Sequence, residues 1–299
     1  MLDACAFVRA EAGLLAAAAG GEPALLVAPL DGETALRGRH QREGLGDGAG
    51  ARVAWRLGGG RAAFVGRGSV GLALALPRAD ALSPGDHFGP ERVINRHVRG
   101  LLRGLSRLGT PARYLGRDSV RVGSRAVALV SQDGAASGAV LFEALVGAER
   151  PPVVPAARGG EPWAALEASA VRTVEEIISG YANATGAPLE PAGAPPEGPA
   201  PDAGPRAGHY VGRSVAIGRL EVSVRLERGR IAAVSFAGEL IAPASWLEAT
   251  EAALLGAAPA AGELGAVIAR CLERADAALL GALPEDLVLA VLGAAAEQT

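Results

Sequence analysis

The most informative segment of this 299-residue chain is Trp-Arg-Leu-Gly-Gly-Gly-Arg-Ala-Ala-Phe-Val-Gly, residues 55–66. Three consecutive glycines, Gly58, Gly59 and Gly60, follow a predicted strand, so the turn can adopt positive φ values and present bare backbone amides. The flanking Arg56 and Arg61 supply charge for a carboxylate or a phosphate. A glycine-rich turn with solvated arginines would have the same sequence, so the segment alone leaves both interpretations open.

A second glycine pattern lies at residues 66–71. Gly66, Gly68 and Gly71 match the spacing of the dinucleotide-binding fingerprint, which requires a strand before it and a helix after it. The residues that follow Gly71 are strand-like instead. We therefore interpret this segment as a hairpin turn.

The composition limits the chemistry, because the chain contains no lysine and all 29 of its basic residues are arginine. A lysine amine can lose its proton and act as a nucleophile, whereas a guanidinium stays charged, so mechanisms that use a catalytic lysine are excluded. With 49% hydrophobic residues, 20% charged residues and a net charge of -3, the chain is typical of globular proteins. The arginines are spread along the sequence without an evident basic stripe, so we expect no nucleic-acid partner.

The sequence also gives expectations about location and metals. The first residues lack a basic leader, and no apolar run reaches the roughly 18 residues of a membrane span, so we expect a cytoplasmic protein with no membrane partner. Cys5 and Cys271 resemble small buried hydrophobic residues, and the four histidines have no metal-ligating spacing.

Composition divides the chain into two bodies. Pro, Gly and Ala dominate residues 185–208, which predicts a linker between a larger domain at 1–184 and a smaller one at 209–299. In the larger body we predict helices at 6–19, 92–108 and 163–178, and strands at 24–27, 52–55, 62–65, 70–76, 114–115, 120–122 and 127–130. In the smaller body we predict strands at 214–217, 220–226 and 231–236, and helices at 244–255, 264–279 and from 285 onward. Closely spaced strands with few helices between them predict an α+β fold, with a mixed, largely antiparallel sheet and packed helices.

Several segments, in the same order along the chain, resemble motifs of one enzyme family. They are Glu-Ala-Gly-Leu-Leu at 11–15, Leu-Arg-Gly-Arg-His-Gln at 36–41, the glycine-rich segment at 55–66, Asn95, Gly-Arg-Asp-Ser-Val at 116–120, and Phe-Ala-Gly-Glu-Leu-Ile at 236–241 with Leu-Leu-Gly at 254–256. Together they resemble the lipoate-protein ligase family, which is related in fold to biotin-protein ligases. That family activates lipoate with ATP as an acyl-adenylate and transfers it to a lysine of an acyl-carrier domain. The resemblance implies a biotin/lipoate ligase-like catalytic domain followed by a C-terminal accessory domain.

The departures from the family pattern concern the residues of the reaction. In the family's Arg-Arg-x-x-Gly-Gly-Gly-Ala-Val-x-His-Asp loop, this chain has Trp55, Arg61, Val65 and Gly66 at the first arginine, third glycine, histidine and aspartate positions. The position of the family's lysine, which reaches the acyl carboxylate and the bridging phosphate, is occupied by Ala126. The neighbouring Arg125 could replace that lysine only with a register shift of one residue, because adjacent strand residues point to opposite faces.

The resemblance also implies a set of site residues. It places Arg125 as a candidate catalytic residue and Asp118 as a displaced magnesium ligand, with ATP, Mg²⁺ and lipoate or another short acid as cofactors and ligand. Near residues 131–141 the family often has a His-Gly-Thr-Leu-Leu element, and Ser137 takes the histidine position, where we interpret it as a turn residue. The implied ligand-binding residues are Arg56, Gly58, Gly59, Gly60, Arg61, Arg117, Arg125, Ser137 and Gly138.

Three functional hypotheses follow from these observations. The first is a ligase-like protein with an acyl- or adenylate-binding cleft whose adenylation chemistry is weakened or lost, with an acyl-carrier (lipoyl) domain as a partner. The second is an active ATP-dependent ligase in which Arg125 or Arg61 replaces the lysine. The third is a structural or regulatory relic that binds neither ligand.

Overall fold

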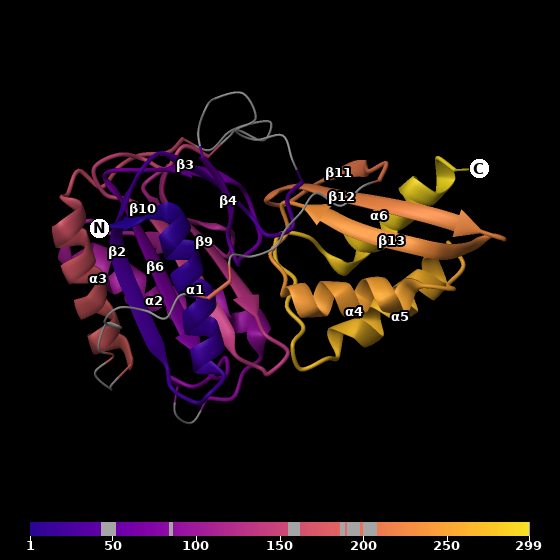
Figure 1. Ribbon diagram of the computed structural model, residues 1–299, viewed down its shortest axis with the longest axis horizontal. Coiled ribbons are helices and arrows are strands. Elements are labelled where there is room, and N and C mark those ends of the chain that lie inside the picture. Colours follow the sequence, from indigo (N-terminus) through magenta and orange to yellow (C-terminus); the bar gives the residue numbers. More distant parts are fainter. Residues whose placement is uncertain are drawn as a thin grey trace.

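The computed structural model describes residues 1–42, 52–83, 86–154, 162–185, 189, 198–199 and 208–298. Figure 1 shows two lobes side by side, the larger from the N-terminal part of the chain and the smaller from residue 208 onward. Most of the linker that we predicted at 185–208 lies outside the described residues. In the described part of the chain, no helix combines the length and apolar character needed to cross a bilayer.

The larger lobe is built on a seven-stranded sheet. Its elements are β1 (Leu2–Asp3), α1 (Ala4–Ala18), β2 (Ala24–Asp31), β3 (Thr34–Arg37), β4 (Arg52–Trp55), β5 (Ala63–Val65), β6 (Ser69–Leu76), η1 (Pro90–Arg92), α2 (Val93–Arg107), β7 (Arg113–Tyr114), β8 (Ser119–Val122), β9 (Arg125–Gly134), β10 (Val140–Gly147) and α3 (Ala170–Thr185). The sheet order is β1-β2-β6-β10-β9-β8-β7, with antiparallel pairing except between β1 and β2. The predicted mixed, largely antiparallel α+β architecture is therefore confirmed.

Helices cover both faces of this sheet. α1 packs on one face, where Phe7 and Leu14 meet Leu129 and Leu141, and the small sheet β4-β3-β5 lies beside it. α2 and α3 pack on the opposite face, where Val98 of α2 lies in the same core as Phe142. Consecutive strand residues point to opposite faces, so strands covered on both sides are apolar along most of their length.

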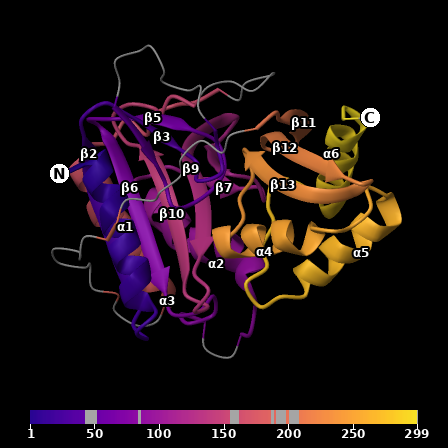
Figure 2. The same cartoon turned by 45° about the vertical axis from the view of Figure 1, so that its right-hand side comes forward.

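The smaller lobe has its own core. A three-stranded antiparallel sheet, β11 (Val211–Val215), β12 (Gly218–Glu227) and β13 (Arg230–Gly238), packs against α4 (Ala244–Leu254), α5 (Ala261–Leu272) and α6 (Pro284–Ala296). Trp246 is the largest fully buried side chain of this core. The turned view shows β13 and α4 beside the larger lobe (Figure 2).

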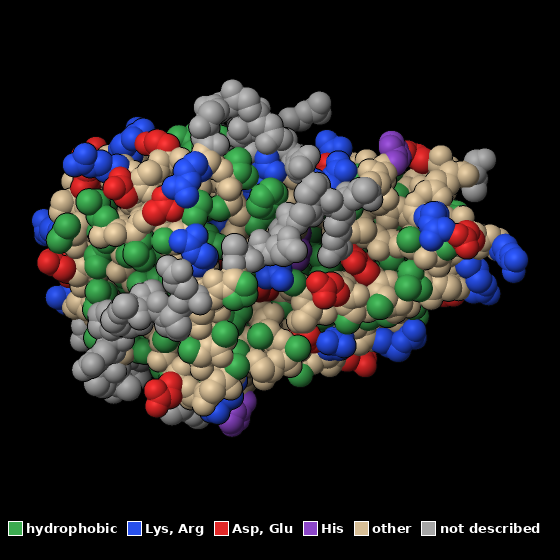
Figure 3. Space-filling view, viewed as in Figure 1, with side chains coloured by type: hydrophobic (Ala, Val, Ile, Leu, Met, Phe, Trp, Pro, Cys, Tyr) green, Lys and Arg blue, Asp and Glu red, His purple; other side chains and the backbone are tan. Residues whose placement is uncertain are grey.

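The two lobes also share apolar contacts. Ile217 and Ile241 of the smaller lobe belong to the buried cluster formed by the large sheet and α2. Charged side chains of both signs are interspersed over the visible surface of both lobes (Figure 3).

Three predictions of local structure need correction. The helix predicted at 163–178 begins only at Ala170, because Pro162 and Ala164 bond to Ala126 in strand fashion (2.9 Å each). The helix predicted at 264–279 spans Ala261–Leu272. The segment at 66–71 is a tight turn, closed by the Ser69 amide on the Gly66 carbonyl (2.9 Å), but it joins strands of two different sheets and is not a hairpin.

Candidate functional site

Arg56 holds the glycine loop from inside. The residue is 1% exposed, and its guanidinium pairs with Glu143 of β10. The Nη2 atom donates to the carbonyls of Gly59 (3.0 Å) and Arg61 (2.8 Å), the second and fourth residues of the segment 58–61. Arg56 therefore fixes the shape of the loop, and its charge is already balanced by a buried carboxylate.

Two acidic side chains lie beneath the loop. Glu143 accepts from the Gly58 amide (3.3 Å) as well as from Arg56. Glu11 of α1 is fully buried beside it, and burial, followed by the nearby Glu143 carboxylate, raises the pKa of Glu11 well above its ordinary value. Burial therefore favours the neutral form of Glu11, which lies beside the ion pair of Glu143 and Arg56.

The outer side of the glycine loop contacts the smaller lobe. The Gly60 amide donates to the Leu240 carbonyl (2.7 Å), and Gly60 has the positive φ of 85° that the sequence suggested. A Cβ atom placed on Gly59 would lie 2.1 Å from the same Leu240 oxygen, so only glycine fits there. Ser131 of β9 fixes the Gly59 carbonyl from the other side (2.8 Å). The backbone amide that could receive a phosphate is thus already hydrogen-bonded within the protein.

A buried aspartate connects the two lobes next to this contact. Asp133 of β9 accepts from Arg39 (3.2 Å) and from the amide of Ala244, the first residue of α4 (3.3 Å). α4 has no side-chain cap of its own, so Asp133 provides a cap from the other lobe. Burial raises the pKa of Asp133 to about 6, even though the charge of Arg39 and the hydrogen bonds from the backbone amides of Gly134 and Ala244 lower it.

Arg61 and Asp118 form a second buried ion pair. The Nε and Nη2 atoms of Arg61 reach the two carboxylate oxygens of Asp118 at 2.6 and 2.9 Å, a bidentate arrangement. The guanidinium also lies 5.5 Å from the ring centroid of Trp163. A cation at Asp118 would have to displace this arginine, and the described residues contain no cluster of three or more metal-ligating side chains. The donor set therefore does not fit a magnesium ion.

The residue at the position of the family's lysine is buried in the sheet. Ala126 is completely buried and its backbone bonds to residues 162 and 164. Arg125 precedes it as the first residue of β9 and is exposed, as is Arg117 between β7 and β8. Neither arginine has an ion-pair partner among the described residues. No described contact links either side chain to the glycine loop.

Ser137 and Gly138 lie in the exposed turn between β9 and β10. The Ser137 hydroxyl accepts from the Ala139 amide (3.4 Å), and Gly138 has a φ of 89°. This geometry agrees with our interpretation of Ser137 as a turn residue.

The predicted site residues fall into two groups in the structure. One is a buried group around Arg56, the three glycines, Arg61 and Asp118. The other is an exposed group of Arg117, Arg125, Ser137 and Gly138.

The sequence analysis missed the acidic residues and the Leu240 contact. Glu143 interrupts an apolar strand, Val-Leu-Phe-Glu-Ala-Leu-Val at 140–146, and a charge in such a run is a signal for a buried ion pair. Asp133 likewise ends a buried strand. Leu240 lies in the segment 236–241 that resembles a family motif, but its contact is made by the backbone carbonyl, which no side-chain pattern indicates.

Comparison with known proteins places this geometry in context. No family model matches the sequence, and no curated protein matches it. Among solved structures, lipoate-protein ligase A bound with ATP is similar with a TM-score of 0.52 and 16% identity, over 64% of this chain and 84% of that one. The lipoate-protein ligase of a Thermoplasma acidophilum lipoylation system gives 0.52 and 15%, over 63% and 82% of the two chains.

This chain has the lipoate-protein ligase fold. P. falciparum LipL1 in complex with lipoate is also similar, at a TM-score of 0.56 and 11% identity over 83% of this chain and 82% of that one. At these identities the comparison concerns the fold, as the resemblance of the motifs predicted. Which side chains could bind a ligand or catalyse a reaction must therefore be inferred from the residues of this chain.

Proposed function

We propose that this protein is a lipoate-ligase-like binding protein in which acyl activation is weakened or lost. The observation that carries the proposal is that the groups around the glycine loop are already paired with one another. The Gly60 amide bonds to Leu240 and the Arg61 guanidinium bonds to Asp118. These contacts occupy the hydrogen-bond donors that would otherwise stabilise the negative charge that develops on an acyl phosphate.

The absence of a lysine at position 126 determines how much slower we expect acyl activation to be. A preorganised charge aimed at the reacting oxygens contributes about 3 kcal/mol or more in many enzymes. Its loss would slow the reaction by about two orders of magnitude. Ala126 offers no charge at the family's lysine position, and Arg61 would have to leave Asp118, a buried carboxylate, to compensate.

The fold is compatible with ligand binding, but the Leu240 carbonyl already occupies the Gly60 amide. An acyl or adenylate group at the glycine loop must displace the Leu240 carbonyl from the Gly60 amide. We infer that binding to lipoate, octanoate or their adenylates is weak while the two lobes remain in contact. ATP enters the proposal as a ligand, and Mg²⁺ does not, because the donor set around Asp118 does not fit it.

The proposed partner is an acyl-carrier domain. The Thermoplasma acidophilum ligase with this fold was solved as part of a lipoylation system with its E2 lipoyl domain. We extend that class of partner to this chain. A carrier domain that binds without being lipoylated would agree with a binding role.

Calorimetric titration with a non-hydrolysable lipoyl-adenylate analogue tests the binding proposal. Ile241→Ala removes apolar contacts between the lobes, and Leu247→Ala removes a buried side chain inside the smaller lobe as a matched control. We expect Ile241→Ala to bind the analogue more tightly than the wild type, by about tenfold for each 1.4 kcal/mol removed from the lobe contact. Equal affinities for all three proteins would contradict competition by Leu240, and a flat titration for all three would favour a relic.

An active ligase is the second candidate. Its supporting observation is the exposed position of Arg125, which leaves this guanidinium available to an incoming substrate. This alternative requires acid-dependent exchange of pyrophosphate into ATP that disappears in Arg125→Ala. Binding of the acid without exchange would exclude it.

A further inference from the structure

A row of five arginines follows the outer face of α2, beginning at Arg92, the last residue of η1 and the N-cap of α2. They occupy positions at intervals of four, three, four and four residues: Arg92, Arg96, Arg99, Arg103 and Arg107. Since each helical residue turns the chain by about 100°, these positions fall within a sector of about 80°. The sequence analysis did not identify this row, which becomes apparent only when the residues three and four positions apart are placed on one helix face.

The arginine row is separate from the glycine loop. The apolar side of α2, with residues such as Val98, Leu101 and Leu105, packs on the large sheet. This is the sheet face opposite to the one that α1 and the glycine-loop region cover. Ligands at the loop and partners on the arginine row therefore do not compete for the same atoms.

Carboxylates stand between the arginines at defined positions. Arg92 lies 3.7 Å from Glu91, Arg96 pairs with Asp86, and Arg107 donates to Glu176 of α3 at 2.6 Å. Arg99, in the middle, is exposed and has no ion-pair partner among the described residues. The surface thus presents separate cationic points and not a uniform positive field.

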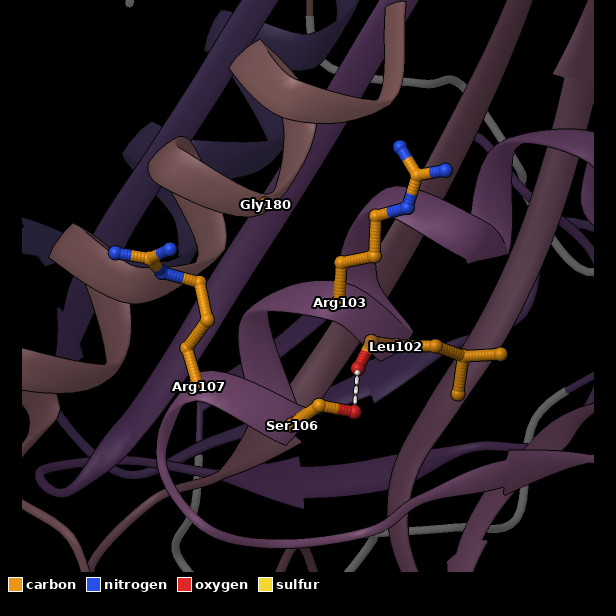
Figure 4. Close-up of a pocket in the computed structure, with 5 residues that line it drawn as sticks. All are labelled: Leu102, Arg103, Ser106, Arg107 and Gly180. Carbon is orange, nitrogen blue, oxygen red and sulfur yellow. Dashed lines mark hydrogen bonds between the residues drawn. The ribbon is translucent and has the colours of Figure 1, made fainter.

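A hollow of about 360 Å³ opens at the C-terminal end of this row. Leu102, Arg103, Ser106 and Arg107 of α2 line it together with Gly180 of α3. Figure 4 shows Arg103 and Arg107 extending in the same general direction from successive turns of α2, with α3 beside them. α2 and α3 cross closely beside the hollow, since a Cβ atom on Gly180 would lie 2.4 Å from the Gly100 carbonyl oxygen.

We infer that the arginine row and this hollow form a docking surface for an acidic segment of another protein. Carboxylates of the segment would pair with Arg99 and its neighbours, because guanidinium forks match carboxylates in a bidentate manner. An apolar side chain of the segment fits the hollow beside Leu102 and Gly180. Interleaved acidic residues favour a partner with discrete charges over a nucleic-acid backbone or an anionic membrane, whose negative charge is continuous.

Fluorescence anisotropy with the full-length protein tests this inference. The probe is a labelled peptide of about fifteen residues, the length of α2, composed of Glu and Asp with a leucine at every fourth position. A peptide with the same leucines and with Gln and Asn as the other residues controls for apolar binding. Duplex DNA and phosphatidylglycerol vesicles at the same ionic strength test the other two partner classes.

The matched variants are Arg99→Glu/Arg103→Glu on the row and Arg225→Glu/Arg270→Glu on exposed positions of the smaller lobe. We expect salt-dependent binding of the acidic peptide that falls about tenfold or more in the first variant and stays within about twofold in the second. Equal thermal midpoints would show that both variants remain folded. No peptide binding, equal loss in both variants, or tighter binding of DNA or vesicles than of the peptide would overturn the inference.

Discussion

Replacing Gly59 with alanine is the sharpest structural perturbation of the lobe contact. The new Cβ atom would lie 2.1 Å from the Leu240 carbonyl oxygen and 3.0 Å from the Cα atom of Ile241. Both neighbours are backbone atoms, so no side-chain rotation can relieve the clash. The Leu240 carbonyl must retreat by about 1 Å before the contact becomes tolerable.

The loss of stability expected for Gly59→Ala has two contributions. Forcing extra volume into a packed site costs about 1–3 kcal/mol. Moving the Leu240 carbonyl away from the Gly60 amide also breaks a buried hydrogen bond, which contributes about 1 kcal/mol. We therefore expect Gly59→Ala to lower the free energy of unfolding, or of lobe docking, by about 2–4 kcal/mol.

Urea denaturation followed by far-ultraviolet circular dichroism measures this change. The matched control is Gly265→Ala in α5, where no atom lies within 4 Å of the new methyl group and alanine should stabilise the helix by about 1 kcal/mol. Separation of the lobes before global unfolding would appear as a second transition. A single transition for Gly59→Ala within about 0.5 kcal/mol of the wild type would refute the close contact.

Three further predictions concern the buried acidic groups. Because the pKa of Asp133 is raised to about 6 from about 3.8, the folded state binds its proton more tightly than the unfolded state does. The free energy of unfolding should therefore decrease by about 2 kcal/mol between pH 4 and pH 6, and pH-dependent urea denaturation should show that this decrease vanishes in Asp133→Asn. Asp118→Ala should cost about 3–5 kcal/mol because the buried Arg61 guanidinium loses the carboxylate that balances its charge, whereas the double replacement Arg61→Leu/Asp118→Leu should cost less. Equal losses in chemical denaturation would contradict this prediction. Glu11→Gln should change stability at pH 7 by less than about 1 kcal/mol because burial favours the neutral form of Glu11, and a much larger loss by the same measurement would show that it is ionised.

The sequence predicted much of the secondary structure because local patterns determined it. The helix at Val93–Arg107 has apolar residues at helical spacing and ends before Gly109, whose φ is 79°, as its stop signal suggested. The three strands and the helices of the smaller lobe also follow from alternation and helical spacing. By contrast, β10 was missed because it is buried on both faces and shows no alternation.

The candidate site was less predictable because its decisive contacts join distant segments. The motifs identified Arg56, Arg61, Asp118 and the glycines, but not that Arg61 and Asp118 bind each other across 57 positions of the chain. The same limit applies to Asp133 and α4, which are 111 residues apart. Local sequence patterns predict which side chains can carry charge, whereas tertiary packing decides which of them are already neutralised.

The most direct test of the account is acid-dependent exchange of labelled pyrophosphate into ATP by the purified protein, with lipoate and octanoate as the acids. We predict an exchange rate at least about two orders of magnitude below that of a lipoate-protein ligase with its lysine intact, and no further change in Arg125→Ala. Exchange at the full ligase rate that is abolished in Arg125→Ala would contradict the account, because the exposed arginine would then supply the missing charge.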